Sequence, residues 1–378
     1  MTIDLKSLIR PNIINLKPYK PILPFEVLSA QLGRQPGEII KLDANENPYG
    51  PSPLVAEALA EAPYLHIYPD PECRELRAAL ADYTGLEADY LLVGLGADEL
   101  IDLIMRLFIE PGDGVVNCPP TFGMYAFDAD VNGAKLIEVW RKPDFAVDVA
   151  GIEAVFPPHP QPLSQWTRGR GEGAVPKLIF VTSPNNPDGS LLGDDDLKRL
   201  LALPAVVVLD EAYVEFGGSS RIHWVKDYNN LIVLRTFSKW AGLAGMRIGY
   251  GAFPPDIIAH MWKIKQPYNV PVGSQLAALA SLRDRARLMQ HVSQITAQRD
   301  RFYAALAEFD WLKPYPSHSN FILCKVEGGR RALDIKQELA AQGILIRHYD
   351  SPGLADCIRI SMGAPQSMTR LLEALREL

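Results

Sequence analysis

Short apolar runs alternate with longer amphipathic stretches through the middle of the chain. The runs are rich in valine, isoleucine and leucine, as buried strands are, and the stretches between them place apolar residues at helical spacing. Strands that alternate with helices predict an α/β fold whose sheet is mostly parallel and covered on both faces. The apolar runs are YLLVGLG (90–96), GVVNC (114–118), KLIEV (135–139), KLIFVTS (177–183), VVVL (206–209) and LIVLRTF (231–237).

The two ends of the chain follow other patterns, so we expect three parts. Residues 1–50 contain six prolines, which predict an extended N-terminal arm and the start of a small domain. Residues 51–275 form the large domain. Residues 276–378 form a long connecting helix and a smaller C-terminal α/β domain, because a proline-free helical region precedes a strand–helix–strand pattern. The finer elements expected are helices at 53–62, 274–309 and 330–341, strands at 320–325, near Leu345 and near Ile358, and a last helix from Gln366.

Residues 157–174, PPHPQPLSQWTRGRGEGA, fit neither the strand period nor the helix period. They predict a surface insertion between a helix and the strand that begins at Lys177, since long surface loops are tolerated at little cost in free energy. The basic run within them is too short, on an acidic chain, to indicate a nucleic-acid site.

Composition narrows the class of protein. The net charge is −7, from 38 basic and 45 acidic residues, so the chain lacks the basic footprint that binding to nucleic acid or an anionic membrane requires. No run of about 18 apolar residues predicts a membrane span, and the N-terminus has no apolar core or cleavage site of a secretory signal. We therefore expect a cytoplasmic protein without nucleic-acid or membrane partners.

Cysteine and histidine spacing predicts no metal site. The four cysteines are scattered without a CxxC pair, and the seven histidines form no HxxxH or Cys/His cluster. We interpret the cysteines as reduced, mostly buried residues rather than catalytic thiols. They are Cys73, Cys118, Cys324 and Cys357.

Polar residues follow four of the predicted strands where those strands end. Because the carboxyl ends of parallel strands meet at one edge of a sheet, where α/β folds place their ligand crevice, these residues should share a site. Each alone has a plainer explanation as a turn, a helix cap or a solvated lysine. They are Ala97 and Asp98 after 90–96, Asn186 after 177–183, Asp210 and Tyr213 after 206–209, and Ser238 and Lys239 after 231–237.

Lys239 suggests what chemistry this edge performs. A neutral lysine amine there can form a Schiff base with an aldehyde cofactor. Ser238 and Arg247 would supply a hydroxyl and a guanidinium fork for a phosphate group on that cofactor. The order and spacing of all these groups are more specific than any single motif.

The motifs SPNNPDG (183–189), DEAY (210–213) and SKWAGLAGMR (238–247) resemble those of the fold-type I aminotransferases, which depend on pyridoxal 5'-phosphate (PLP). The resemblance covers nearly the whole chain and implies a seven-stranded, mostly parallel sheet with PLP as cofactor. One departure is Asp188, which stands where the family's motif has threonine. Further blocks look like those of histidinol-phosphate aminotransferases, namely NLKPY (15–19), LDANENPYG (42–50), YPDP (68–71), PPTFGMY (119–125) and CIRISMG (357–363).

This resemblance implies a role for each residue near the cofactor ring. Lys239 would hold PLP as a Schiff base and then move the substrate α-proton as base and acid. Asp210 would pair with the pyridine nitrogen and keep it protonated. Tyr213 and Asn186 would hydrogen-bond the ring hydroxyl, and Phe122 would stack on the ring face.

The phosphate of PLP would lie at a helix N-terminus. The resemblance implies that the backbone N–H groups of Ala97 and Asp98 bind it, together with Ser238 and Arg247. Tyr68 would reach the same phosphate from a partner subunit, which implies a homodimer with shared active sites.

The resemblance also implies the substrates, L-histidinol phosphate and 2-oxoglutarate or glutamate, in histidine biosynthesis. Arg359 matches the arginine that holds the substrate carboxylate, and a guanidinium fork suits a phosphate equally. Tyr19 and Arg347 are expected at the substrate phosphate, and Asn47 is a further substrate-binding candidate. Asn320 is a weaker one.

Other functions share these residues. An aromatic amino-acid aminotransferase and a PLP-dependent amino-acid-phosphate decarboxylase would use the same lysine, aspartate and phosphate site. A PLP-binding regulator without turnover would normally carry a basic helix-turn-helix domain at its N-terminus, and we expect none in this chain. A decarboxylase would release CO2 without a 2-oxo acid, whereas an aminotransferase requires one.

Overall fold

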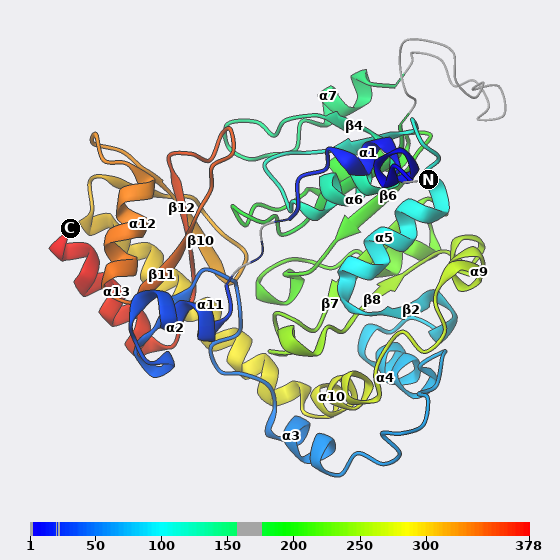
Figure 1. The fold of residues 1–378 in the computed structure, drawn as a ribbon, viewed down its shortest axis with the longest axis horizontal. Helices are drawn as coiled ribbons and strands as arrows, with labels where there is room; N and C mark the ends of the chain where they lie inside the picture. Colours follow the sequence, from blue (N-terminus) through cyan, green and yellow to red (C-terminus); the bar gives the residue numbers. More distant parts are fainter. Residues whose placement is uncertain (1–2, 20, 22, 157–175) are drawn as a thin grey trace.

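The computed structural model describes residues 3–19, 21, 23–156 and 176–378, so the insertion predicted at 157–174 lies outside the described residues. Its largest element is a seven-stranded sheet in the order β2-β8-β7-β6-β5-β3-β4 (Figure 1). Only β8 runs antiparallel to its neighbours, which confirms the mostly parallel sheet. Its strands are β2 (Leu91–Gly94), β3 (Gly114–Asn117), β4 (Lys135–Glu138), β5 (Pro176–Thr182), β6 (Val206–Asp210), β7 (Leu231–Thr236) and β8 (Gly249–Ala252).

Helices cover both faces of this sheet because its central strands are apolar on both sides. Val207 and Val233 belong to one core, whereas residues adjacent to them in the same two strands, Val208 and Ile232, belong to the other core. This alternation is the two-residue period of a strand. The helices are α5 (Gly96–Phe108), α6 (Met124–Asn132) and α9 (Pro255–Ile264) on one face, and α4 (Arg74–Thr84), α7 (Val149–Ala154), α8 (Asp194–Leu201) and α10 (Val272–Arg283) on the other.

A five-stranded sheet in the order β1-β11-β12-β10-β9 lies beside the first. Strand β1 comes from the N-terminal part of the chain and pairs in parallel with β11, while the other neighbours are antiparallel. The strands are β1 (Ile40–Leu42), β9 (Leu312–Pro314), β10 (Phe321–Val326), β11 (Ile344–His348) and β12 (Cys357–Ser361), with helices α12 (Ala332–Ala341) and α13 (Pro365–Glu377).

The region expected as one long helix at 274–309 is two helices. Helix α10 ends at Arg283, and α11 (Arg285–Ala305) begins after Asp284. The Asp284 carboxylate accepts a 2.5 Å hydrogen bond from the hydroxyl of Ser52, which directly precedes helix α3 (Pro53–Ala60). This bond connects the break between α10 and α11 to the start of α3. The remaining helices are α1 (Pro11–Ile14), α2 (Phe25–Leu32) and α3 (Pro53–Ala60), and the 3₁₀ turns are Leu5–Leu8, Pro36–Glu38, Ala88–Tyr90, Val214–Phe216, Ile222–Lys226, Ala244–Met246 and Leu306–Glu308.

Among the described residues, no helix has the length and apolar character needed to cross a membrane. The division into parts at residues 50 and 275 stays a prediction.

Candidate active site

A cavity of about 500 Å³ opens where the carboxyl ends of the large sheet's strands meet the small sheet. Residues from segments far apart in the sequence line it, as the strand-end argument predicts. The predicted residues among them are Tyr19, Ala97, Asp98, Phe122, Asn186, Asp210, Tyr213, Ser238, Lys239, Arg247, Arg347 and Arg359. Tyr68 and Asn47 are not part of the lining.

Lys239 lies just past the end of β7 and is one of the residues that line the cavity. Its Nζ atom donates to the backbone oxygen of Ala44 at 3.3 Å and lies 5.7 Å from the centroid of the Tyr213 ring. Burial, with a smaller contribution from the positive charge of Arg359, lowers the pKa of Lys239 to about 8. A lowered pKa makes the neutral amine available near neutral pH, as a nucleophile or a general base must be.

Asp210 ends β6 at the floor of the cavity. Its carboxylate accepts hydrogen bonds from the Tyr125 hydroxyl at 2.6 Å and from the backbone N–H of Ala212 at 2.8 Å. Burial raises its pKa to about 6, and these two hydrogen bonds oppose that rise. It forms no ion pair within the described ranges, so this buried carboxylate is suited to receive a cationic group from a ligand.

Helix α5 begins at the cavity and presents an anion site. Gly96 has φ of +76°, the left-handed region, and no side chain caps the helix. A Cβ atom on Gly96 would lie 2.9 Å from the Nη2 atom of Arg247, so the missing side chain lets the guanidinium approach. Arg247 in turn forms a 2.6 Å ion pair with Asp98. Free N–H groups at a helix N-terminus bind phosphate well.

These groups fit PLP by their chemistry. The uncapped start of α5, with Arg247 and the Ser238 hydroxyl beside the same cavity, suits a phosphate. Lys239 suits an aldehyde, and the unpaired Asp210 carboxylate suits a protonated pyridine nitrogen. When bound, this cofactor supplies an electron sink for the carbanion formed at a substrate α-carbon.

Arg359 lies on β12 and is almost fully buried, with 5% of its surface exposed. It donates to the side-chain oxygen of Asn186 at 2.6 Å and to the backbone oxygen of Asp43 at 2.7 Å. Asn186 is thereby held by the arginine expected to bind substrate. Arg347 lies opposite Arg359 on β11, and the half-exposed Tyr19 lines the cavity from the N-terminal segment.

Asn45 is a site residue that the sequence reasoning missed. Its amide donates to the Tyr213 hydroxyl at 2.9 Å, and its side-chain oxygen accepts from Ser361 at 2.8 Å. It adopts a positive φ of 55° in the block LDANENPYG. The resemblance of that block to the family was the only indication of a site residue there, and from it we predicted Asn47 rather than Asn45. Other lining residues that were missed are Tyr125, Trp140, Tyr349 and Leu354.

The two asparagines named as weaker candidates support the site from outside it. Asn47 donates to the backbone oxygen of Trp240 at 3.0 Å, next to Lys239 in sequence. Asn320 donates to the backbone oxygen of Asn45 at 3.0 Å. Both therefore hold backbone that carries site residues.

Asp188, the departure from the family's motif, has a structural role. It is buried, accepts a 2.7 Å hydrogen bond from the backbone N–H of Ser190, and accepts another from the Asn185 amide. Asn185 also donates to the backbone oxygen of Pro120, in the segment that carries Phe122. The Asp188 carboxylate therefore accepts hydrogen bonds from the donors of this turn, and Asn185 links the turn to a segment that lines the cavity.

Tyr68 projects from the surface on the segment that leads into α4. Its side chain is 79% exposed, and its ring stacks on Tyr268 with centroids 4.7 Å apart. Within the described ranges it is separate from the cavity lining of its own subunit.

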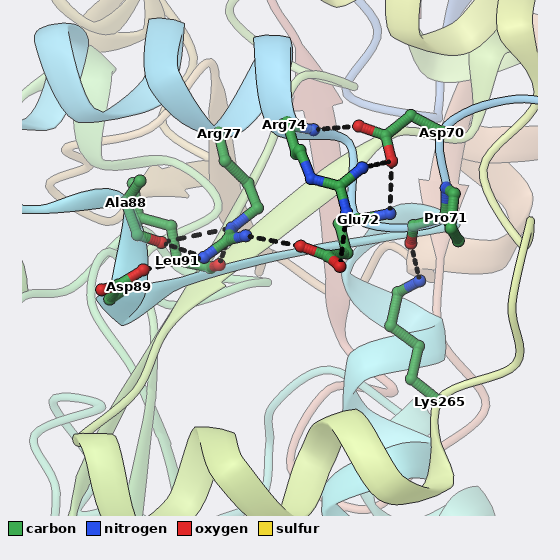
Figure 2. A network of polar contacts seen from close by, with 9 residues as sticks. All are labelled: Asp70, Pro71, Glu72, Arg74, Arg77, Ala88, Asp89, Leu91 and Lys265. Carbon is green, nitrogen blue, oxygen red and sulfur yellow. Dashed lines mark hydrogen bonds and ion pairs between the residues drawn. The ribbon is translucent and has the colours of Figure 1, made fainter.

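A polar network fixes the residues that follow Tyr68 (Figure 2). The Asp70 carboxylate accepts from the Arg74 guanidinium at 2.7 Å, and Lys265 donates to the backbone oxygen of Pro71 at 3.1 Å. Lys265 also donates to Asn269, at 2.5 Å. Tyr68 is therefore exposed next to residues that several hydrogen bonds hold in place.

Across the described residues, no group of three or more His, Cys, Asp or Glu side chains could hold an ion. The four cysteines are free and buried.

Comparison with known proteins gives consistent likenesses. The family model for aminotransferase class I and II matches residues 37–375. A chloroplastic histidinol-phosphate aminotransferase from Nicotiana plumbaginifolia is 54% identical over 371 residues, covering 98% of this chain and 86% of that protein. A histidinol-phosphate aminotransferase from Roseiflexus castenholzii is 49% identical over the full length of both. The crystal structure of histidinol-phosphate aminotransferase from Sinorhizobium meliloti, in complex with pyridoxal-5'-phosphate, has a TM-score of 0.85 at 31% identity, covering 98% of this chain and 97% of that one.

Proposed function

Because the chain belongs to the histidinol-phosphate aminotransferase family, within the class I and II aminotransferases, we propose that it transfers an amino group from L-histidinol phosphate to 2-oxoglutarate. The products are imidazole acetol phosphate and L-glutamate, and the reaction belongs to histidine biosynthesis. PLP is the cofactor. The observation that carries the proposal is the cavity that joins a lysine of lowered pKa, an unpaired buried carboxylate and two arginines.

Each residue has a task that its surroundings support. Lys239 takes the proton from the substrate α-carbon and returns it, which a pKa of about 8 allows near neutral pH. Asp210, fixed by Tyr125 and Ala212, would hold the cationic nitrogen of the cofactor. Tyr213, oriented by Asn45, would donate toward the ring hydroxyl.

Residues of the cavity lining also support the proposal at the anionic ends of the ligands. Ala97, Asp98, Ser238 and Arg247 surround the start of α5, where the cofactor phosphate would lie. Phe122 provides an apolar ring beside this position. At the other end, Arg359 and Arg347 bind the substrate carboxylate or phosphate, and Tyr19 closes that side.

Steady-state kinetics with 2-oxoglutarate test this function. The purified protein should use histidinol phosphate with a kcat/KM at least about 100-fold above that for phenylalanine or tyrosine, because a carboxylate offers the two arginines fewer oxygens and less negative charge than a phosphate does. Lys239→Ala should abolish transfer. A preference for the aromatic amino acids would assign an aromatic aminotransferase, and CO2 release without a 2-oxo acid would assign a decarboxylase.

We further propose a homodimer in which Tyr68 completes the partner's phosphate site. Tyr64, Leu65, Ile67 and Tyr68 are each more than half exposed, and an exposed apolar group of this kind is typical of an interaction surface. The network at Asp70 would keep Tyr68 extended toward the partner. Light scattering after size exclusion should give the mass of two chains, and a monomer would contradict the proposal.

The cytoplasm is the proposed compartment, and the four free, buried cysteines support it because disulfides are rare there. The plant relatives are named as chloroplastic. Fractionation of cells that produce the chain should recover it with cytoplasmic markers.

A further inference from the structure

Two arginines of the small sheet face each other at the cavity without a compensating charge. Arg347 on β11 and Arg359 on β12 are register partners across an antiparallel pair, and both line the cavity. Like charges directly opposite each other destabilise a sheet. Among the described residues neither guanidinium has an ion-pair partner, so an anion bound between them would relieve their repulsion.

Tyr349 lies against both guanidinium groups. It follows Arg347 by two positions, directly after the end of β11 at His348. The guanidinium carbon of Arg347 lies 5.6 Å from the centroid of the Tyr349 ring, and that of Arg359 lies 5.8 Å from it. Both distances are within the range of cation–π attraction. One aromatic ring therefore attracts both cations and partly screens their charges.

The protonation state and the contacts of Tyr349 suit a side chain that sets the distance between the two guanidinium groups. Burial raises the pKa of the Tyr349 phenol, although the two arginines oppose the rise, so the ring stays neutral. Its hydroxyl is buried and has no hydrogen-bond partner within the described ranges. The contacts it does make are through the ring, to the two guanidinium groups and to a small cluster of Phe145, Leu323, Leu354 and Cys357.

We propose that Tyr349 is a positioning residue that sets the spacing of Arg347 and Arg359, so that the pair binds one doubly charged phosphate in preference to a single carboxylate. A phosphate has three terminal oxygens and can receive two guanidinium forks on separate pairs of oxygens, whereas a single fork already engages both oxygens of a carboxylate. The proposal rests on the proposed function, because it explains how that site selects a phosphate-bearing amine over aromatic amino acids.

The PLP-loaded enzyme and three variants test this role. Tyr349→Leu removes the ring, Tyr349→Phe keeps the ring and removes the hydroxyl, and Tyr315→Leu is the matched control. Tyr315 packs against the same apolar cluster but is not part of the cavity lining. The measurements are kcat and KM for histidinol phosphate and for phenylalanine, and competitive inhibition by inorganic phosphate and by acetate.

Tyr349→Leu should lower kcat/KM for histidinol phosphate about tenfold, mainly through KM, and should weaken inhibition by phosphate about as much. Its kcat/KM for phenylalanine and its inhibition by acetate should stay within about twofold of the starting values, because one fork suffices for a carboxylate. Tyr349→Phe and Tyr315→Leu should keep the original ratio between the two substrates.

Two results would overturn the proposal. One is an equal loss for both substrates and both anions in Tyr349→Leu, which would indicate general damage. The other is a Tyr349→Phe variant as defective as Tyr349→Leu, which would show that the hydroxyl acts rather than the ring. If Tyr349→Leu does not fold, Tyr349→Met removes the same ring with a more adaptable side chain. Failure of the original enzyme to use histidinol phosphate would refute the proposed function, while the ratio of phosphate to acetate inhibition would still decide the role of Tyr349.

Discussion

At the scale of single residues, burial adjusts two ionisable groups in opposite directions. The same loss of water lowers the pKa of the Lys239 amine and raises that of the Asp210 carboxyl, because in each case it disfavours the charged form. Both shifts place a titration closer to neutral pH, where acid–base catalysis is most effective. Both pKa shifts are therefore present in the protein before a ligand binds.

The first prediction concerns the pH dependence at Lys239. Only the neutral amine can bond to an aldehyde, and its pKa of about 8 means that the neutral fraction grows as pH rises through that value. Covalent PLP incorporation into cofactor-free protein should therefore speed up from pH 7 to pH 9 and then level off. Arg359→Gln should move the midpoint to higher pH, because it removes a positive charge that lowers this pKa. A midpoint near 10.5, the ordinary value for lysine, would contradict the shift.

The second prediction separates catalysis from folding at Asp210. Asp210→Asn keeps the shape but removes the negative charge that would hold a cationic ring nitrogen, so kcat should fall at least about 100-fold. Because burial already disfavours the charged carboxylate, the melting temperature of the cofactor-free variant should not decrease. Calorimetry alongside kinetics checks both statements. A variant that loses activity only in proportion to its loss of folded protein would count against the proposed role.

At the scale of elements, the site depends on where strands end and helix α5 begins. Gly96 is needed there twice, for its left-handed backbone and for the close approach of Arg247. Gly249 at the start of β8 likewise lies against α5, since a Cβ on it would be 2.6 Å from the backbone nitrogen of Ala97. The anion site is therefore formed by tight backbone packing as much as by side chains.

The third prediction tests this packing. Gly96→Ala should raise the dissociation constant for PLP at least about tenfold, because a left-handed alanine costs about 1–2 kcal/mol and its Cβ displaces the Arg247 guanidinium. Gly37→Ala is the control, since a Cβ there meets no heavy atom within 4 Å. Fluorescence titration of cofactor-free protein with PLP gives both constants. Equal affinities in the two variants would remove Gly96 from the phosphate site.

The elements also show how far the site could be predicted from the sequence. Lys239, Asp210 and Asn186 each follow a recognisable strand, so the local sequence pattern was enough to predict that they lie at one edge of the sheet. Asn45 and Tyr125 were missed because each acts across the fold, on Tyr213 168 residues away and on Asp210 85 residues away. A tyrosine inside an amphipathic helix gives no sign of a partner so distant.

At the scale of the whole molecule, two sheets meet at the cavity and each supplies part of the site. The parallel sheet was predictable because its apolar runs alternate regularly with amphipathic helices. The three-residue strand β1 was not predicted, since its pairing with β11 is set by a neighbour about 300 residues away rather than by its own pattern. The break at Asp284 was missed for a similar reason, because the helical pattern continues through it and the contact with Ser52 is long-range.

The fourth prediction tests whether the active sites are shared between subunits. A heterodimer of one Lys239→Ala chain and one Tyr68→Ala chain should contain one site with both residues intact, because Tyr68 comes from the opposite chain. Tandem-tagged heterodimers should therefore bind PLP at one site per dimer with the original affinity and show about half of the original activity. If Tyr68 acted within its own chain, every site of the heterodimer would be defective.

The central claim, that Lys239 and its neighbours use PLP to move an amino group from histidinol phosphate, is tested most directly by absorbance. The spectrum of the purified PLP-loaded protein is recorded alone, then with histidinol phosphate, and then with 2-oxoglutarate. The visible band of the cofactor bound at Lys239 should disappear with the first ligand and return with the second. A band that ignores histidinol phosphate but responds to phenylalanine or tyrosine would contradict the substrate, and a protein that never develops the band would contradict the account of the site.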